Sequence, residues 1–203
     1  LPENYKNSNY AIGASSFRGC SGLTSVVMGN SVTSIGEHAF RDCSSLTSVE
    51  LGNSLKSIGY AAFAYCSGLT SIKIPDSVTS IDDGAFYECS GLTTVKISNS
   101  VTTIPYASFK GCTSLTSVNF KGEPPSVGTN VFYNISSSAT GSYLPQYASE
   151  WKAVITDGKW NGLWMVMARP ENEILFTWDA TKGFVDSNGN PVFIDNAFTL
   201  TAE

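Results

Sequence analysis

Cysteine is the residue type whose spacing in this chain first suggests chemistry. The five cysteines lie 23 residues apart, at Cys20, Cys43, Cys66, Cys89 and Cys112. Thiolates bind zinc, and neighbouring thiols can form disulfides. A zinc site needs ligands that converge on one point, whereas a fixed step places one thiol on each unit of a repeat, roughly 5 Å from the next. Distance alone does not forbid a disulfide, but an odd number of parallel side chains favours buried thiols that fill space in a core, so we expect no metal site.

Acid–base chemistry has few candidates. His38 is the only histidine, and a catalytic dyad built on it would need an oriented carboxylate and a nucleophile. Asp82 and Asp83 are adjacent, so they do not face a common cleft on their own, and a solvated pair is the simpler interpretation. A glycosidase-like pair of carboxylates is the remote alternative. We therefore expect no catalytic residue, no cofactor and no enzymatic activity.

Two weaker signals concern calcium and sugars. Residues 186–190 resemble part of a calcium loop, but the glycine and the distal glutamate of the EF-hand pattern do not fit, and a hairpin turn at Asn188-Gly189 explains them better. Aromatic residues between positions 143 and 164 could stack on a glycan, although sealing the end of a repeat array is the simpler role. A carbohydrate-binding module that uses these aromatics is an alternative function.

The charge of the chain argues against nucleic acid and membrane surfaces. The formal net charge is −5, and residues 170–203 carry all of it, because the acids and bases of residues 1–169 cancel. Counterion-release binding to nucleic acid needs a basic patch, and none is present. No apolar run reaches the roughly 18 residues of a membrane helix, so we expect no membrane insertion in this segment.

The repeat itself is the strongest signal in the sequence. Three apolar residue types keep the same step as the cysteines: Ile12, Ile35, Ile58, Ile81 and Ile104; Phe17, Phe40, Phe63, Phe86 and Phe109; and Leu23, Leu46, Leu69, Leu92 and Leu115. A fixed period of roughly 20 to 50 residues is typical of a solenoid, in which each unit buries its apolar face against its neighbours.

One unit of the repeat runs from Ile35 to Ser57. Its spacing of Leu46, Val49 and Leu51 alternates over the last residues and predicts a short strand with one buried face, and such strands would stack into a parallel sheet. The segment Glu37–Cys43 places a phenylalanine three residues before a cysteine, which predicts one or two helical turns on the opposite side.

The whole unit resembles a known family. The pattern A-F-x-x-C-x-x-L-T-S-V-x-I-x-x-S-V-T-x-I, with its 23-residue period, is similar to the BspA-like class of leucine-rich repeats found in bacterial surface proteins. The resemblance implies an α/β repeat, a right-handed leucine-rich repeat solenoid of about five coils with a C-terminal cap and a short β tail. It also implies a cell-surface or secreted protein that binds ligands or adheres, and not an enzyme.

We predict four structural segments from this interpretation. Residues 1–11 form an N-terminal cap or a truncated repeat, and residues 12–120 form the leucine-rich repeats. Residues 121–169 form a C-terminal capping region, with a helix at Gln146–Ile155 and a strand at Leu163–Met167. Residues 170–203 form a β appendage or the start of a further domain, with strands at 174–178, 183–186 and 198–202.

Positions that vary between units while the frame stays fixed are the candidate binding site. On the strand side they are Val27, Glu50, Lys73, Lys96 and Asn119, flanked by Ser48, Ser71 and Thr94. The alternative lies on the other side, where tyrosines accompany arginine and lysine: Tyr60, Tyr65, Tyr87 and Tyr106. Tyrosine and arginine are enriched at interface hot spots. We expect a protein partner, such as a host extracellular-matrix or cell-surface protein, with a glycan or a passive scaffold role as alternatives.

Overall fold

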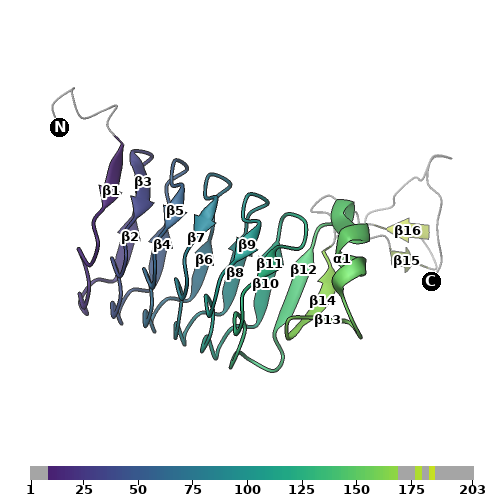
Figure 1. Cartoon of the computed structure of the whole chain (residues 1–203). Helices are drawn as coiled ribbons and strands as arrows, with labels where there is room; N and C mark the ends of the chain where they lie inside the picture. The colour runs from purple at the N-terminus through teal and green to yellow at the C-terminus, as the bar shows by residue number, and fades with distance from the viewer. Residues whose placement is uncertain (1–8, 169–176, 180–182, 186–203) are drawn as a thin grey trace. The chain divides into compact units, whose positions relative to one another are not determined.

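The computed structural model describes residues 9–168, 177–179 and 183–185. The chain divides into two compact units, Leu1–Ala168 and Arg169–Glu203. In the first unit the backbone winds into successive coils that stack along one axis and end at a helix (Figure 1). Each coil combines two short strands with a run of tight turns. The repeat solenoid predicted from the 23-residue period is confirmed.

The first ladder of strands forms what we call the strand face. It contains β2 Ser25–Val27, β4 Ser48–Glu50, β6 Ser71–Lys73, β8 Thr94–Ile97, β10 Ser117–Phe120, β12 Thr140–Tyr143 and β14 Leu163–Met167. These strands pair in parallel, in the sheets β2-β4 and β6-β8-β10-β12-β14. The register steps by 23 residues, so that Val95 pairs with Val118. The parallel sheet expected on this side is therefore confirmed.

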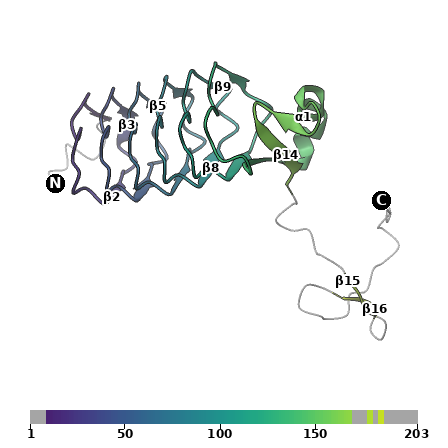
Figure 2. The same ribbon diagram turned by 90° about the horizontal axis from the view of Figure 1, so that it is seen from below.

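A second ladder, which the sequence interpretation did not include, runs along the opposite side of the coils. It contains β1 Tyr10–Ile12, β3 Val32–Ile35, β5 Ser57–Ile58, β7 Ser80–Ile81, β9 Thr103–Ile104 and β11 Ser126–Val127. Figure 2 shows β3, β5 and β9 along one side and β2 and β8 along the other. The isoleucines that keep the period end these strands and face the core, as Ile58 does with no exposed surface.

The prediction of helical turns at Glu37–Cys43 was wrong. This side of each coil, which we call the turn face, consists of consecutive tight turns. The amides of His38, Phe40 and Asp42 donate across to carbonyl oxygens of the next coil, whereas the amides between them donate three residues back. Both His38 and Asp42 have positive φ, 55° and 62°. A helix would need every amide for bonds within its own turn, but here half of them join adjacent coils.

The core between the three sides is built from columns of identical residues. The phenylalanine rings of successive coils stack nearly parallel, with centroids 5.1 Å apart from Phe40 to Phe63 and 5.4 Å apart from Phe63 to Phe86. Phe63, Phe86 and Phe109 are fully buried, whereas Phe17 in the first coil is 42% exposed, because no described coil covers it.

The coils continue beyond residue 120, so the estimate of about five coils was low. Val127 pairs with Ile104 in the second ladder, and Phe132 stacks on Phe109 at 5.8 Å. This coil escaped notice in the sequence because Ile135 and Ser138 replace the cysteine and leucine of the motif. With β12 and β14, the strand face has seven rungs.

An aromatic cluster closes the C-terminal end of the first unit. Pro145–Tyr147 forms a 3-10 turn (η2), α1 spans Ala148–Val154, and β13 Lys159–Trp160 pairs antiparallel with β14. The helix expected at Gln146–Ile155 and the strand expected at Leu163–Met167 are confirmed. Trp151 is fully buried, packs on Phe120 and donates its indole N–H to the Gly122 carbonyl oxygen at 2.9 Å. The cluster thus covers the last coil.

In the second unit, the described residues form one antiparallel pair, β15 Thr177–Asp179 with β16 Gly183–Val185. These strands overlap those expected at 174–178 and 183–186. The expected hairpin turn at Asn188-Gly189 and the strand at 198–202 lie outside the described residues, as do residues 1–8 of the N-terminal segment.

The stack predicts that a core phenylalanine is worth more in the middle than at the end. Phe63→Ala removes a ring packed on both faces and should cost about 3–5 kcal/mol of unfolding free energy through the cavity it leaves. Phe17→Ala should cost less, because among the described residues only Phe40 stacks on the Phe17 ring. Urea unfolding of both variants measures the difference. Equal costs would contradict a stack in which each coil is stabilised by its neighbours.

Candidate functional site

Four of the five cysteines form a buried column. All five are free thiols, and four of them are buried. Each buried thiol donates to a phenylalanine carbonyl oxygen of the preceding coil, as Cys66 does to Phe40 at 3.1 Å. Burial raises the pKa of the Cys66 and Cys112 thiols to about 12. No group of three or more potential metal ligands lies together among residues that the structure describes.

The strand-face candidates line up as the sequence suggested. Pairing between β2 and β4 sets Val27 beside Glu50, and pairing from β6 to β10 sets Lys73 beside Lys96 and Lys96 beside Asn119. The flanking column places Ser48, Ser71 and Thr94 on successive strands. Most of these side chains are exposed, with Val27 at 73%.

The strand face is hollowed near its charged column. Two hollows of about 250 and 230 Å³ lie at the ends of the strands, and Lys73 and Pro75 line both. Lys73 and Lys96 occupy paired positions on adjacent strands, so they form a doubly positive spot. Such a spot suits an acidic group of a partner.

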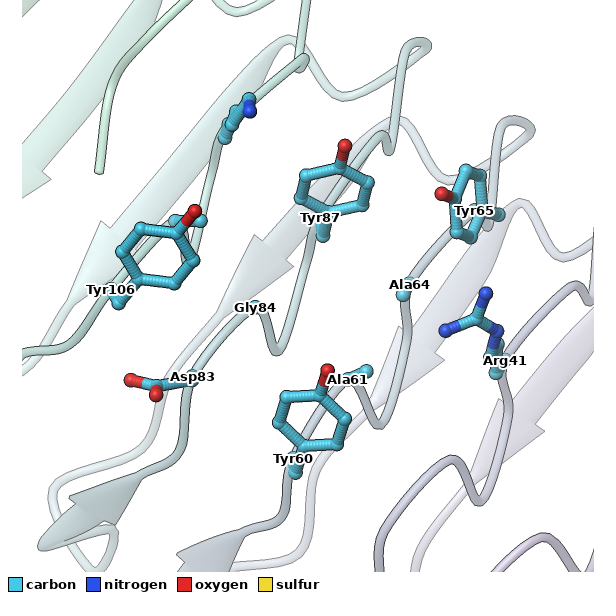
Figure 3. A pocket seen from close by; sticks show the side chains of 11 residues that line it. Arg41, Tyr60, Ala61, Ala64, Tyr65, Asp83, Gly84, Tyr87 and Tyr106 are labelled. Carbon is cyan, nitrogen blue, oxygen red and sulfur yellow. The ribbon is translucent and has the colours of Figure 1, made fainter. Parts of the chain in front are cut away.

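The turn face carries a hollow of similar size with a different lining. A hollow of about 290 Å³ is lined there by residues of four coils and is walled by all four tyrosines of the alternative prediction, Tyr60, Tyr65, Tyr87 and Tyr106. Figure 3 shows Tyr60, Asp83 and Tyr106 following one another along one side, with Tyr87 and Tyr65 across from them. Tyr60 and Tyr106 are each 47% exposed, and Tyr65 is 38% exposed.

Small residues on the turns create the floor of this hollow. Ala61, Gly84 and Ala107 occupy one position in three successive coils, with φ of 47°, 61° and 53°. The preceding coil has His38 at the same position, with φ of 55°. The backbone therefore keeps its shape whether the side chain is present or absent. The hollow exists because three coils in a row have small side chains at this position.

Cations pack over the tyrosines on the far wall. The Arg41 guanidinium lies 4.9 Å from the centre of the Tyr65 ring. The Lys110 ammonium lies between two rings, 5.7 Å from Tyr87 and 5.5 Å from Tyr133. Tyr65 and Tyr87 meet edge to face at 5.4 Å. Partial desolvation, together with neighbouring Tyr65 and Glu88, raises the pKa of the Tyr87 hydroxyl.

The sequence interpretation missed two parts of this site. It treated Asp82 and Asp83 as one solvated pair, but only Asp83 lines the hollow. It also gave no role to the small floor residues, whose signal was the loss of a large side chain at one repeat position over three coils. His38, the only histidine, lies edge-on to Tyr60 at 5.1 Å and beside Glu37. No nucleophile accompanies it in the contacts of the described residues.

Most cap aromatics suggested as a sugar platform are inside the protein. Tyr143, Trp151 and Trp160 are at most 7% exposed, because they seal the last coil. Trp164 is 46% exposed, but Lys159 lies 4.1 Å from its ring centre and occupies one face. No described helix is long and apolar enough to cross a membrane.

Comparison with known proteins identifies the repeat. Residues 10–139 match the profile of the BspA type leucine rich repeat region in six copies. No curated protein matches the chain.

Solved structures of leucine-rich repeat proteins are similar to the chain. A leucine rich cell surface protein from Faecalibacterium prausnitzii A2-165 is 38% identical with a TM-score of 0.53; the match covers 54% of this chain but only 29% of that one. The T. pallidum leucine rich repeat protein is 25% identical, with a TM-score of 0.50, and covers 72% of this chain and 77% of its own. The pneumococcal vaccine antigen PcpA, 19% identical with a TM-score of 0.64 and coverage of 84% and 44%, shares the fold.

The buried cysteine column predicts a selective thiol reaction. In the native protein at pH 8, a thiol reagent should label the exposed Cys20 and leave the four buried cysteines unlabelled. Thiolates are the reactive form, and the raised pKa keeps the buried thiols protonated. In denaturant all five should react. Native labelling of several cysteines, or none in denaturant, would contradict a column of packed free thiols.

Proposed function

The chain belongs to the BspA-type leucine-rich repeat family, and we propose on this basis that it is a non-enzymatic module that binds a partner protein at the bacterial cell surface. Proteins built from such repeats typically act through protein–protein contacts on a rigid frame. The similar protein from F. prausnitzii is described as a cell surface protein, which supports a surface or secreted location here. A host extracellular-matrix or cell-surface protein is the proposed partner.

The tyrosine-walled hollow on the turn face is the observation that carries this proposal. Interface hot spots are enriched in tyrosine and arginine and gather in pockets that exclude water. The hollow combines exposed rings of Tyr60, Tyr65 and Tyr106 with Arg41 in a concave surface. Tyrosine offers a large, stiff contact area with a polar tip, so ordering it on binding costs little entropy.

The strand face is the second contact surface in this proposal. Its column of Glu50, Lys73, Lys96 and Asn119 varies in charge while the frame stays fixed. Charges on an open sheet influence association rate and specificity more than affinity. We therefore assign the main binding energy to the hollow and a steering role to the lysine pair.

Filling the hollow tests this function. Gly84→His places on the floor the side chain that His38 already carries at the same repeat position, and a Cβ at Gly84 meets only the Tyr87 Cβ at 3.6 Å. The left-handed φ of 61° costs a non-glycine residue about 1–2 kcal/mol, a strain that His38 already bears at φ 55°, so the fold should tolerate the change. Biolayer interferometry against purified extracellular-matrix proteins and mammalian glycans should find a protein that binds the wild type. Gly84→His should weaken that binding about tenfold or more.

Two comparisons make the result specific. Ser15→His is the matched control, because it adds the same side chain at the same position in the first coil, outside the hollow. It should bind as the wild type does. The double variant Lys73→Glu/Lys96→Glu should slow association with an acidic partner and change dissociation less. Equal affinity of Gly84→His and wild type would reject the hollow, and silence against every probe would favour a passive scaffold.

A further inference from the structure

One column of the hollow pairs a carboxylate with two aromatic rings. Tyr60, Asp83 and Tyr106 occupy the same position in three successive coils, so Asp83 has a tyrosine on either side (Figure 3). The Asp83 side chain is exposed. Among the described residues, the ion pairs of acidic side chains involve Asp42 and Glu37, and Asp83 has none. The column therefore presents a negative charge that is free to meet a cation from outside.

In a neighbouring column of the same face, a cation one coil away from a tyrosine on either side lies close to both rings. Tyr87, Lys110 and Tyr133 also stand at one position in successive coils, and the Lys110 ammonium lies 5.7 and 5.5 Å from the two ring centres. The distance follows from the coil spacing, since the stacked core rings of these coils repeat every 5.3–5.8 Å. A cation within about 6 Å of a ring centroid is attracted to the ring face.

We propose that the Tyr60–Asp83–Tyr106 column binds the guanidinium group of an arginine side chain on the partner protein, an inference that rests on the proposed function. A cation held by Asp83 would lie one coil away from each ring, as Lys110 lies between its own two tyrosines. In the Lys110 column the cation belongs to the chain itself. In the Asp83 column the chain supplies the negative charge, and the partner would supply the cation.

Arginine fits this column better than lysine does. The guanidinium is planar, so it can stack on a tyrosine ring while two of its N–H groups donate to one carboxylate. It is also less strongly hydrated than an ammonium, so it enters a partly closed hollow at lower cost. The floor of Ala61, Gly84 and Ala107 is buried and lies next to the column, where it can contact the methylene groups of the arginine.

The far wall sets the direction from which the arginine enters. Arg41 and Lys110 stand there, and Arg41 is 3.4 Å from the Asp42 carboxylate while Lys110 packs between two rings. These cations repel a second positive charge on their side of the hollow, and they can donate hydrogen bonds to carbonyl or carboxylate groups of the partner. A segment that carries an arginine followed by acceptor groups matches both walls.

The probe that tests this inference is N-acetyl-arginine methylamide, with the citrulline analogue as its neutral, equally shaped control. Titration of the full chain, labelled with ¹⁵N, should shift the amide signals of Gly84 and its floor neighbours saturably with the arginine compound and not with citrulline. Asp83→Asn should weaken this binding about tenfold or more, because it removes the charge and keeps the shape. Asp82→Asn, one residue away and outside the hollow, should bind as the wild type does.

Each outcome decides the inference separately from the proposed function. Equal shifts with citrulline, unchanged binding by Asp83→Asn, or no shift at tens of millimolar would overturn the guanidinium site. If Gly84→His still loses the protein partner while Asp83→Asn keeps it, the hollow binds protein by another contact. If Asp83-dependent arginine binding is present but Gly84→His keeps its protein partner, the cation site stands and the proposed protein contact falls.

Discussion

The hydrogen bonds between successive coils are the constraint on which the rest of the structure depends. On all three sides of the solenoid, backbone amides donate to the neighbouring coil: the two strand ladders do so by parallel pairing, and the turn face by every second amide. On the turn face, for example, the amide of Gly84 donates to Tyr106, that of Phe86 to Ser108 and that of Glu88 to Lys110. Because each bond links equivalent parts of adjacent units, every side chain position becomes a straight column along the axis.

Columns explain both the core and the surface. Inside, they stack phenylalanine on phenylalanine and place a thiol beneath each preceding carbonyl oxygen. Outside, they let one position change from coil to coil without moving the backbone, as His38, Ala61 and Gly84 do with similar φ. The hollow is a run of small residues in one such column, walled by tyrosines of three others: Tyr60 and Tyr106 stand in one column, Tyr65 in a second and Tyr87 in a third. A site built this way is held in shape before a ligand arrives, which reduces the entropy that binding must overcome.

The period alone was enough to predict the solenoid, the core columns and the strand face, because a repeated motif must repeat its structure. The turns were mispredicted, since Phe40 and Cys43 have a spacing that also fits one face of a helix, and sequence does not show where an amide donates. The second ladder was missed because strands such as Ser57–Ile58 are only two residues long. The four tyrosines that wall the hollow were named from their residue type, but the finding that Asp83 lines it and Asp82 does not depends on where the turn directs each side chain.

Residue-resolved hydrogen exchange tests the central claim, that backbone bonds between coils hold the turn face in place. The amides of Gly84, Phe86 and Glu88 should exchange as slowly as the paired strand amides of β8, although they lie in turns without helix or strand. Their equivalents in the first described coil, at Ser15 and Phe17, should exchange faster, because no described coil covers them and Phe17 is 42% exposed. Rapid exchange at Gly84, Phe86 and Glu88, at the rate of an ordinary surface loop, would contradict the account.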